Sequence, residues 1–577
     1  MLAMLTNKSA WQYIHSAMSC VSPPIAPTEV ALSSLRDELK GNIFRNLDGL
    51  FTKYFEGNPW SLVIQEKLRA VESAKILNRL SDDIPAIAHF DTLLEWLSNF
   101  QTLFFAVDQT NFRFHSQLLS TTGSAPQACI YLETSDLQST AGSTRVFGEF
   151  HHESAPAETD DDIMRFCWRA QQVFKSQSAR CFVHGFLVRG TTLELWVFDR
   201  SGAYSSDRFD LAQRPDLLVR TLAGYTVMSD EEIGFNTFVK RLAPRSDSYV
   251  TFDLDKKFHL RPELIATTNY IVGPGTACYG ASTSPTGEPS TVIKFSWRED
   301  EEPTEIRLLQ RARERNAWGV IQLSGYQDLM SIVDIRHGLR FPETFVNKRF
   351  SCVATTPLGR PIRQFTSVRE LLEVLCDLVR ALQSLYVKAR ILHRDVAMKN
   401  LIITHQHSVS SPKGVLIDLN CSLDLDNVCV NEPIVGSDGV MAIGVLYGHR
   451  HTYRHDLESL FYVFLWIVIA NDREHDQAND ILKGMPKTSR LWKWCSMNFL
   501  AVGMDKAADM SPGGFEEILG EFSSDFTPLK GLAKELHALI FPVRDGDIFI
   551  GTDKDEVAVE RLYDGMADAF TRSALAT

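Results

Sequence analysis

Apolar residues recur every three or four positions through the first hundred residues, which is the spacing of an amphipathic helix. The segments LRDELKGNIFRNLDGLF, residues 35–51, and FDTLLEWLSNFQTLFF, residues 90–105, both follow this pattern. We therefore predict mostly helical structure from about residue 36 to residue 105. Residues 1–35 contain the loop-like segment SPPIAPTE and are predicted to form an irregular lead-in.

The pattern then changes to alternating apolar and polar positions. ACIYLE, TRVFGEF and the long run ARCFVHGFLVRGTTLELWVFDRSG are typical of strands joined by hairpin turns. One helical segment, DIMRFCWRAQQVFKSQ, interrupts them at residues 162–177. The simplest interpretation is an α+β domain over residues 36–240.

A second unit is predicted from residue 241 onward. It begins with the strand-like segments NYIVGPG and STVIKFSW and continues with a helix, a strand and long helices to the C-terminus. One of these helices contains LESLFYVFLWIV, which is apolar on nearly all sides. Such a helix belongs at the centre of a helical core.

Composition excludes several classes of protein. With 577 residues, 44% hydrophobic and 23% charged, the chain is an ordinary globular protein of more than one domain. The net charge of -13 disfavours nucleic acid and anionic membranes as partners, and the most apolar run, residues 460–470, is too short to cross a bilayer. The ten cysteines form no C-x-x-C pair, which favours reduced thiols and an intracellular, cytoplasmic or nuclear location.

Candidate chemistry begins in ILHRDVAMKNLIIT, residues 391–404, where a charged tripeptide lies between two apolar runs. Asp395 and Asn400 follow an apolar strand closely enough to direct two oxygen atoms at one point. A further carboxylate, Asp418, closes the apolar run GVLIDLN. Oxygen ligands from Asn400 and Asp418 suit Mg²⁺, which also takes phosphate oxygens and water, and Asp395 is then free to orient a hydroxyl group.

Phosphate chemistry also requires cations and backbone donors. Lys294 lies within the strand-like run VIKFSW, where an ammonium group needs an anionic partner. Glu305, near the start of the predicted helix TEIRLLQRAR, is a candidate for that partner. Upstream, Gly273 and Gly275 predict a turn whose backbone amides could approach phosphate groups.

In this order, the glycine turn, the strand lysine, the helix glutamate, HRDxxxxN and the later aspartate resemble the motifs of a eukaryotic protein kinase. VFKSQSARCFVHGFLVRGTTLELWVFDRSGA, ILHRDVAMKN, GSDGVMA and YRHDLESLFYVFLW resemble the fungal-type protein kinase family in particular, over roughly residues 140 to 470. The resemblance implies a bilobal kinase-like fold, with a β-rich N-lobe at residues 241–359 and a helical C-lobe at residues 360–577, preceded by the α+β domain. It also implies ATP, Mg²⁺ and a protein substrate phosphorylated on Ser or Thr.

The resemblance assigns a role to each motif residue. Asp395 would be the catalytic base, with Arg394 and Lys399 as the cations of the same loop, and Asn400 with Asp418 would hold Mg²⁺. Lys294, braced by Glu305, would hold the ATP phosphates beneath Gly273 and Gly275. Ser437 would stand at the substrate-binding end of the activation segment, and Asp456 would open the buried helix.

Three positions depart from the kinase pattern: Cys278 replaces the third glycine of the turn, Asn420 replaces the glycine of Asp-Phe-Gly, and Gly444 stands where kinases have the glutamate of Ala-Pro-Glu. The loss of that glutamate removes a usual ion pair. These departures motivate a rival interpretation, a pseudokinase scaffold. A small-molecule kinase of the aminoglycoside or choline type is a second rival, disfavoured by Arg394 and by the helix that starts at DLESL.

In the first domain, Glu149 and Glu133 could suggest a metal centre like that of restriction endonucleases. The position two after Glu149 is His151 and not the lysine that such a centre requires. The sequence therefore favours a docking or regulatory module over a nuclease.

Overall fold

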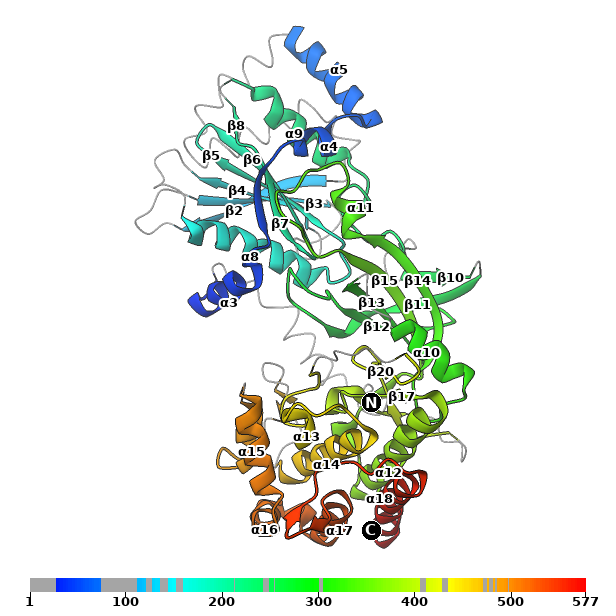
Figure 1. The fold of residues 1–577 in the computed structure, drawn as a ribbon. Helices are drawn as coiled ribbons and strands as arrows, with labels where there is room; N and C mark the ends of the chain where they lie inside the picture. Colours follow the sequence, from blue (N-terminus) through cyan, green and yellow to red (C-terminus); the bar gives the residue numbers. More distant parts are fainter. Residues whose placement is uncertain are drawn as a thin grey trace. The chain divides into compact units, whose positions relative to one another are not determined.

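The computed structural model describes most of the chain in two compact units, and each unit is described by itself (Figure 1). Unit 1 comprises Met1–Pro289, Ile293–Glu302 and Tyr326–Val353, and unit 2 comprises Ser290–Val292, Pro303–Gly325 and Ala354–Thr577. The residues described are 27–73, 112–120, 127–134, 144–151, 159–211, 213–241, 248–253, 255–299, 305–404, 411–427, 434–470, 475–476, 481–482, 485–496 and 498–577. The predicted helix at residues 90–105 and most of the predicted lead-in lie outside these ranges.

Unit 1 begins with an eight-stranded mixed sheet. Seven strands lie in the order β1-β7-β6-β5-β4-β3-β2, and β8 pairs with β6. The pairs β1/β7 and β4/β5 are parallel, and the other pairs are antiparallel. The strands are β1 Ile43–Leu47, β2 Phe112–Ser120, β3 Gln127–Thr134, β4 Thr144–His151, β5 Val183–Arg189, β6 Thr192–Asp199, β7 Gly202–Ser206 and β8 Phe209–Asp210. The helices are α3 Glu29–Leu39, α4 Leu50–Phe55, α5 Pro59–Ser73, α8 Asp160–Ser176 and α9 Pro215–Val227.

The sheet and α8 share one apolar core. Phe147 from β4, Phe166 from α8 and Phe198 from β6 are almost fully buried in it. Thr159 caps α8 in a reciprocal capping box with Asp162, which explains where this helix begins. The predicted strands and the predicted helix at 162–177 are confirmed.

Residues 43–47 were predicted to be helical and form strand β1 instead. Phe44 and Leu47 are both buried although they lie three residues apart, because the register of β1 shifts between them, where Asn46 has φ +59°. Strand β1 pairs in parallel with β7, about 160 residues later in the chain. This distant pairing outweighs local helix propensity.

A second sheet, of seven strands, follows in the order β14-β15-β13-β12-β11-β10-β9. The predicted strand at 269–275 is wrong, because these residues form the connection between β11 and β12. Along β13 the burial alternates, with Ile293, Phe295 and Trp297 buried and Lys294 on the opposite, half-buried face. The strands are β9 Lys240–Arg241, β10 Ser248–Phe252, β11 Lys256–Thr267, β12 Ala277–Ser282, β13 Thr291–Glu299, β14 Gln322–Ser331 and β15 Lys348–Thr356, and the short helix α11 Ile332–Arg336 joins the last two.

Unit 2 is mainly helical and is built around α14 Tyr453–Ile469, in which every residue is buried. This confirms the predicted central helix. The other helices are α10 Glu305–Glu314, α12 Val368–Ser384, α13 Ile443–Leu446, α15 Phe499–Asp509, α16 Pro512–Gly520, α17 Lys530–Ile540 and α18 Glu556–Ala576. The short strands are β16 Gly359–Pro361, β17 Ile391–Leu392, β18 Leu401–Thr404, β19 Gly414–Leu416, β20 Leu423–Asp424, β21 His475–Asp476, β22 Ile481–Leu482, β23 Val543–Arg544 and β24 Asp547–Ile548.

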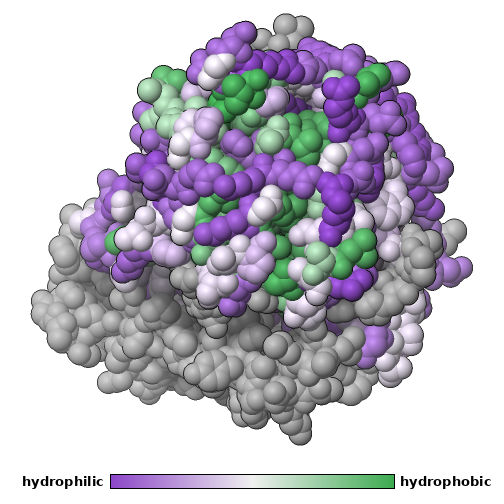
Figure 2. Space-filling view, turned by 90° about the horizontal axis from the view of Figure 1, so that it is seen from below, coloured by the Kyte–Doolittle hydropathy of each residue, from purple (hydrophilic) through white to green (hydrophobic). Residues whose placement is uncertain are grey.

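The predicted α+β content is confirmed, and the predicted boundaries near residues 240 and 360 stay predictions. Apolar side chains on the face drawn in Figure 2 form separate green patches among hydrophilic ones. Within the part of the chain that the structure describes, no helix has the length and apolar character needed to cross a membrane.

Candidate active site

The HRD loop, residues 393–400, lies between β17 and β18, and two small sheets fix its ends. Strand β17 pairs antiparallel with β20, and β18 lies between β16 and β19. Strands β18 and β19 pair antiparallel, as the predicted hairpin requires. Because the apolar strands on both sides are buried, the charged residues between them are held in one place.

Asp456, in the first turn of α14, anchors the loop. Its two carboxylate oxygens accept the backbone N–H groups of His393 and Arg394, each at 2.9 Å, and one of them also bonds His451 Nε2 at 2.9 Å. Burial opposes ionisation of this group, but His451 and the backbone amides hold the pKa of Asp456 below its usual range. A buried carboxylate thus fixes the backbone that carries Asp395.

Asp395 is only 8% exposed, and both of its carboxylate oxygens have partners. Ser437 Oγ donates to one at 2.6 Å, and Asn400 Nδ2 donates to the other at 2.9 Å. Lys399 Nζ lies 3.6 Å from the same oxygen as Asn400. A carboxylate offers about four lone-pair positions, so Asp395 can still accept a further hydroxyl.

Asn400 and Asp418 lie on neighbouring segments. His393 Nε2 bonds the carbonyl of Ile417 at 3.1 Å, and the Ile417 N–H donates to the carbonyl of Asn400 at 3.0 Å. The side-chain amide of Asn400 donates to both the backbone carbonyl and a carboxylate oxygen of Asp395, each at 2.9 Å, so both of its N–H groups face acceptors. Its Oδ1 is therefore not needed for these two bonds, and the chain reaches Asp418 one residue after Ile417.

These two oxygen donors fit Mg²⁺, which binds through one or two protein groups together with phosphate oxygens and water. Among the described residues, no three His, Cys, Asp or Glu side chains come together as a metal site. A metal held by Asn400 and Asp418 would take its further ligands from phosphate oxygens and water.

Two residues of this region adopt left-handed backbone conformations that cost side-chain-bearing residues energy. Arg394 has φ +65° and Asp418 has φ +64°, and such positions cost about 1–3 kcal/mol each. Arg394 Nε donates to the carbonyl of Cys421 at 2.7 Å, and Ser422 Oγ donates to the carbonyl of His393 at 3.2 Å. These contacts join the HRD loop to the segment after Asp418 and stabilise both strained positions.

A comparison with known families identifies the family of the chain. A family model described as fungal protein kinase matches residues 130–468, which is more than half of the chain. The chain belongs to the fungal protein kinase family. The predicted family is thus confirmed, and the family indicates a protein kinase that uses ATP. No curated protein matches this fungal protein kinase.

The glycine turn of the kinase, residues 268–276, is bound by other residues of unit 1. The N–H groups of Ile271 and Val272 donate to one carboxylate oxygen of Glu38, at 2.6 and 2.8 Å. The N–H of Gly273 donates to the carbonyl of Arg200 at 3.2 Å. The turn is therefore held against α3 and the end of β6.

Gly275 has to be glycine for two reasons in this position. Its φ is +48°, and a Cβ atom would lie 2.6 Å from Nε of the fully buried Arg200. Gly273 has φ +152°. Gly275 thus permits the close approach of Arg200, and a role of either glycine toward phosphate stays a prediction.

Lys294 and Glu305 belong to different units of the structure. Lys294 lies in the middle of β13, and Glu305 is the first residue of α10. Both are half-buried. Because Lys294 belongs to unit 1 and Glu305 to unit 2, their pairing stays a prediction.

Gly444 lacks the carboxylate of other kinases, and Glu458 of α14 supplies one nearby. Glu458 is fully buried, accepts the N–H of Ile443 at 2.7 Å, and pairs with Arg454 at 2.6 Å. Arg454 also donates to the carbonyl of Ile540 at 2.8 Å. A buried ion pair therefore fixes the chain just before Gly444.

Sequence reasoning missed several side chains outside the motifs that hold Asp456 or residues 439–443. His451, Glu458 and the buried Lys506 are examples. His451 and Glu458 lie beside or within the predicted central helix and could have been suspected from their place in an apolar stretch. Lys506 lies in FLAVGMDKAAD and carries no comparable signal.

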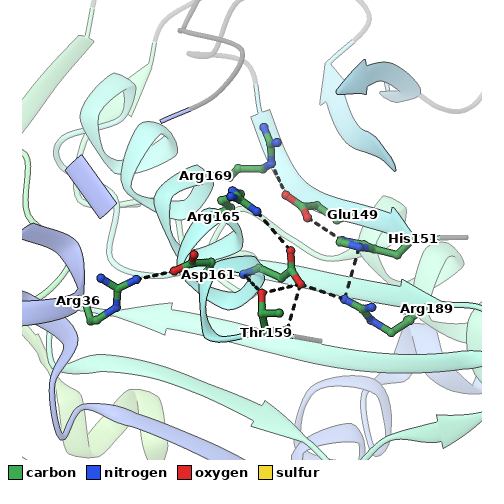
Figure 3. Close-up of polar contacts among 9 residues, drawn as sticks. Arg36, Glu149, His151, Thr159, Asp161, Arg165, Arg169 and Arg189 are labelled. Carbon is green, nitrogen blue, oxygen red and sulfur yellow. Dashed lines mark hydrogen bonds and ion pairs between the residues drawn. The ribbon is translucent and has the colours of Figure 1, made fainter. Parts of the chain in front are cut away.

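The endonuclease-like pair of unit 1 does not come together. Glu149 pairs across the sheet with Cys129, whereas Glu133 pairs with Thr144 at the other end of the same strands. Glu149 is buried between Arg169 and His151, whose ring lies at 3.0 Å (Figure 3). Burial opposes its ionisation, but these two partners hold the pKa of Glu149 below its usual range.

Proposed function

We propose that this chain is a protein kinase that transfers the γ-phosphate of ATP to Ser or Thr hydroxyl groups of protein substrates, with Mg²⁺. The observation that supports it best is the setting of Asp395, which is bonded by Asn400 and Ser437 on a backbone fixed by Asp456. Such pre-arranged groups suit phosphoryl transfer, which depends on positioning and charge neutralisation.

Each residue of the site has a proposed task. Asp395 accepts the hydrogen bond of the substrate hydroxyl and takes its proton as the phosphorus–oxygen bond forms. Lys399, whose side chain is half exposed, neutralises charge on the transferred phosphoryl group. Asn400 and Asp418 would hold Mg²⁺, which offsets the negative charge of the phosphates. Arg394 keeps the loop in its strained conformation.

The nucleotide-side residues complete the proposal. Lys294, braced by Glu305, would hold the α- and β-phosphates, and the turn with Gly273 and Gly275 would cover them.

The cysteine pattern and composition favour an intracellular protein, cytoplasmic or nuclear. A protein substrate is favoured over a small molecule because Arg394 and Ser437 tie the catalytic loop to a segment of the kind that binds polypeptides.

Phosphate transfer from radiolabelled ATP to myelin basic protein tests the proposal. We expect transfer by the wild type that requires Mg²⁺, and a loss of at least about 100-fold in the Asp395→Asn variant, because general-base catalysis contributes about 10²–10⁴-fold. Lys493→Met, a change at an exposed lysine of the same unit, serves as the control and should keep full activity. An inactive wild type, or equal activity of wild type and Asp395→Asn, contradicts the proposal.

A pseudokinase scaffold is the second candidate, because amides of the glycine turn already donate to Glu38. Thermal unfolding with ATP and Mg²⁺ distinguishes the two candidates. A ligand at 100 times its Kd stabilises the folded state by about 2.7 kcal/mol. A scaffold that binds no nucleotide shows no such shift.

A further inference from the structure

Lys506, on α15, is a fully buried lysine whose hydrogen bonds go to backbone carbonyls. Its Nζ donates to the carbonyl of Gly439 at 3.0 Å and to that of Met441 at 2.7 Å. The same atom lies 4.1 Å from the centre of the Tyr462 ring and 4.9 Å from that of Trp494. Two carbonyls and two aromatic faces therefore surround this amine.

Burying an amine in such surroundings lowers the stability of the fold because the group loses its hydration, and a methionine would fill the space without this desolvation cost. Burial lowers the pKa of Lys506 to about 7, although the Glu458 carboxylate opposes the shift. A neutral amine still has two N–H groups, which matches the two carbonyls. The hydrogen bonds are thus satisfied whether or not the side chain is charged.

The two carbonyls belong to the substrate-binding segment, which we define as residues 434–442. Gly436 and Gly439 have φ of +145° and +78°, so the segment has few conformational restraints of its own. Gly439 is also held by Trp494, whose carbonyl accepts its N–H at 3.2 Å. Ser437, two residues before Gly439, donates to Asp395 at 2.6 Å.

Lys506 and Asp395 therefore hold the same short segment at different points. Asp395 receives the Ser437 hydroxyl, and Lys506 holds the carbonyls of Gly439 and Met441. A shift of the segment would change both the surface offered to a substrate and one hydrogen bond of the catalytic carboxylate.

We propose that Lys506 is a positioning residue that fixes the substrate-binding segment against Asp395 and so determines how well the protein substrate binds. The proposal rests on the proposed kinase function. It assigns Lys506 no part in binding ATP. Its loss should therefore raise the KM for protein substrate and leave the KM for ATP unchanged.

The test compares Lys506→Met, which removes both donors, with Lys506→Gln, which keeps a neutral N–H₂ group, and with Lys493→Met as the exposed control. Steady-state assays with myelin basic protein and ATP are run at a temperature at which each variant is folded. We expect Lys506→Met to raise the protein KM at least fivefold, with the ATP KM within twofold of wild type. Lys506→Gln should fall between Lys506→Met and wild type.

Hydrogen exchange of the amides in residues 434–442 gives a second measurement that does not need activity. Faster hydrogen exchange in Lys506→Met, confined to residues 434–442, supports the proposal for Lys506 whether or not the wild type transfers phosphate. Absence of phosphate transfer by the wild type would overturn only the proposed kinase function. Unchanged exchange and KM values overturn the proposal. Equal rises in both KM values, or failure of both variants to fold, overturn it too, because Lys506 would then serve the whole unit.

Discussion

Replacing Asp456 by Asn tests whether a buried carboxylate fixes the HRD loop. The carboxylate accepts the N–H groups of His393 and Arg394 and bonds His451, all at 2.9 Å. Asn keeps one oxygen, so its amide N–H₂ must face at least one of these groups. One backbone donor then loses its acceptor, and His451 loses its anionic partner.

The magnitude follows from these contacts. Hydrogen bonds to a charged group contribute about 1.5–3 kcal/mol each, and breaking a buried charged network costs about 3–5 kcal/mol. For a unit of this size, each kcal/mol lowers the Tm by about 2–4 °C. We therefore expect the transition of unit 2 to move down by about 6–20 °C.

Differential scanning calorimetry measures this shift, and phosphate transfer measured below the Tm shows whether the loop has moved. Asp547→Asn, at an exposed position of the same unit, is the control. A shift below about 2 °C in Asp456→Asn, or an equal shift in the control, would refute the reasoning.

The pH dependence gives an independent check. The pKa of Asp456 is held below its ordinary value of 3.8, so its stabilisation is fully present above that pH. As the pH falls through the lower folded-state pKa, the carboxylate is protonated and the stabilisation is lost. The difference in the free energy of unfolding between wild type and Asp456→Asn should stay constant from about pH 6 to 8 and narrow only below about pH 4. If this difference narrows near pH 7, a group other than Asp456 is titrating.

Two further predictions concern unit 1. Arg336→Met leaves the fully buried Asp199 without its bidentate partner, so the free energy of unfolding, measured with a chemical denaturant, should fall by about 3–5 kcal/mol. The Asp199→Leu/Arg336→Met double variant should recover part of this loss. A double variant whose loss equals the sum of the two single losses would contradict the prediction. Glu38→Ala leaves two amides of the glycine turn without their acceptor and should speed their hydrogen exchange at least tenfold, while the exposed neighbour change Asp37→Ala should not. Unchanged exchange in Glu38→Ala would show that the turn is held by other contacts.

The spacing of apolar residues predicted those helices and strands whose buried face is formed by residues close together in the chain. The hairpin of β5 and β6, the helix α8 and the all-apolar α14 each bury a face that can be read from a few consecutive residues. The approach of the HRD-loop side chains to one another could be predicted because they are close in sequence as well as in space. Asp395 and Asn400 are five residues apart and share two hydrogen bonds.

The rest depends on contacts between distant residues. Strand β1 exists because of β7, and the partner of the glycine turn is Glu38, more than 230 residues earlier. Lys506 looks like any lysine of an amphipathic helix until the carbonyl of Gly439 is placed beside it. No spacing rule in a single sequence contains that information.

The close contact between the first sheet and the glycine turn limits where this chain could be joined to another protein. Arg336, on the helix that joins two strands of the seven-stranded sheet, needs Asp199, and Gly275 must stay small because Arg200 lies against it. A recombination event that joined the kinase motifs to another protein near residue 241 would separate these partners and expose buried charges. The family match begins at residue 130, within strand β3, so Asp199, Arg200, Gly275 and Arg336 all lie inside the matched range.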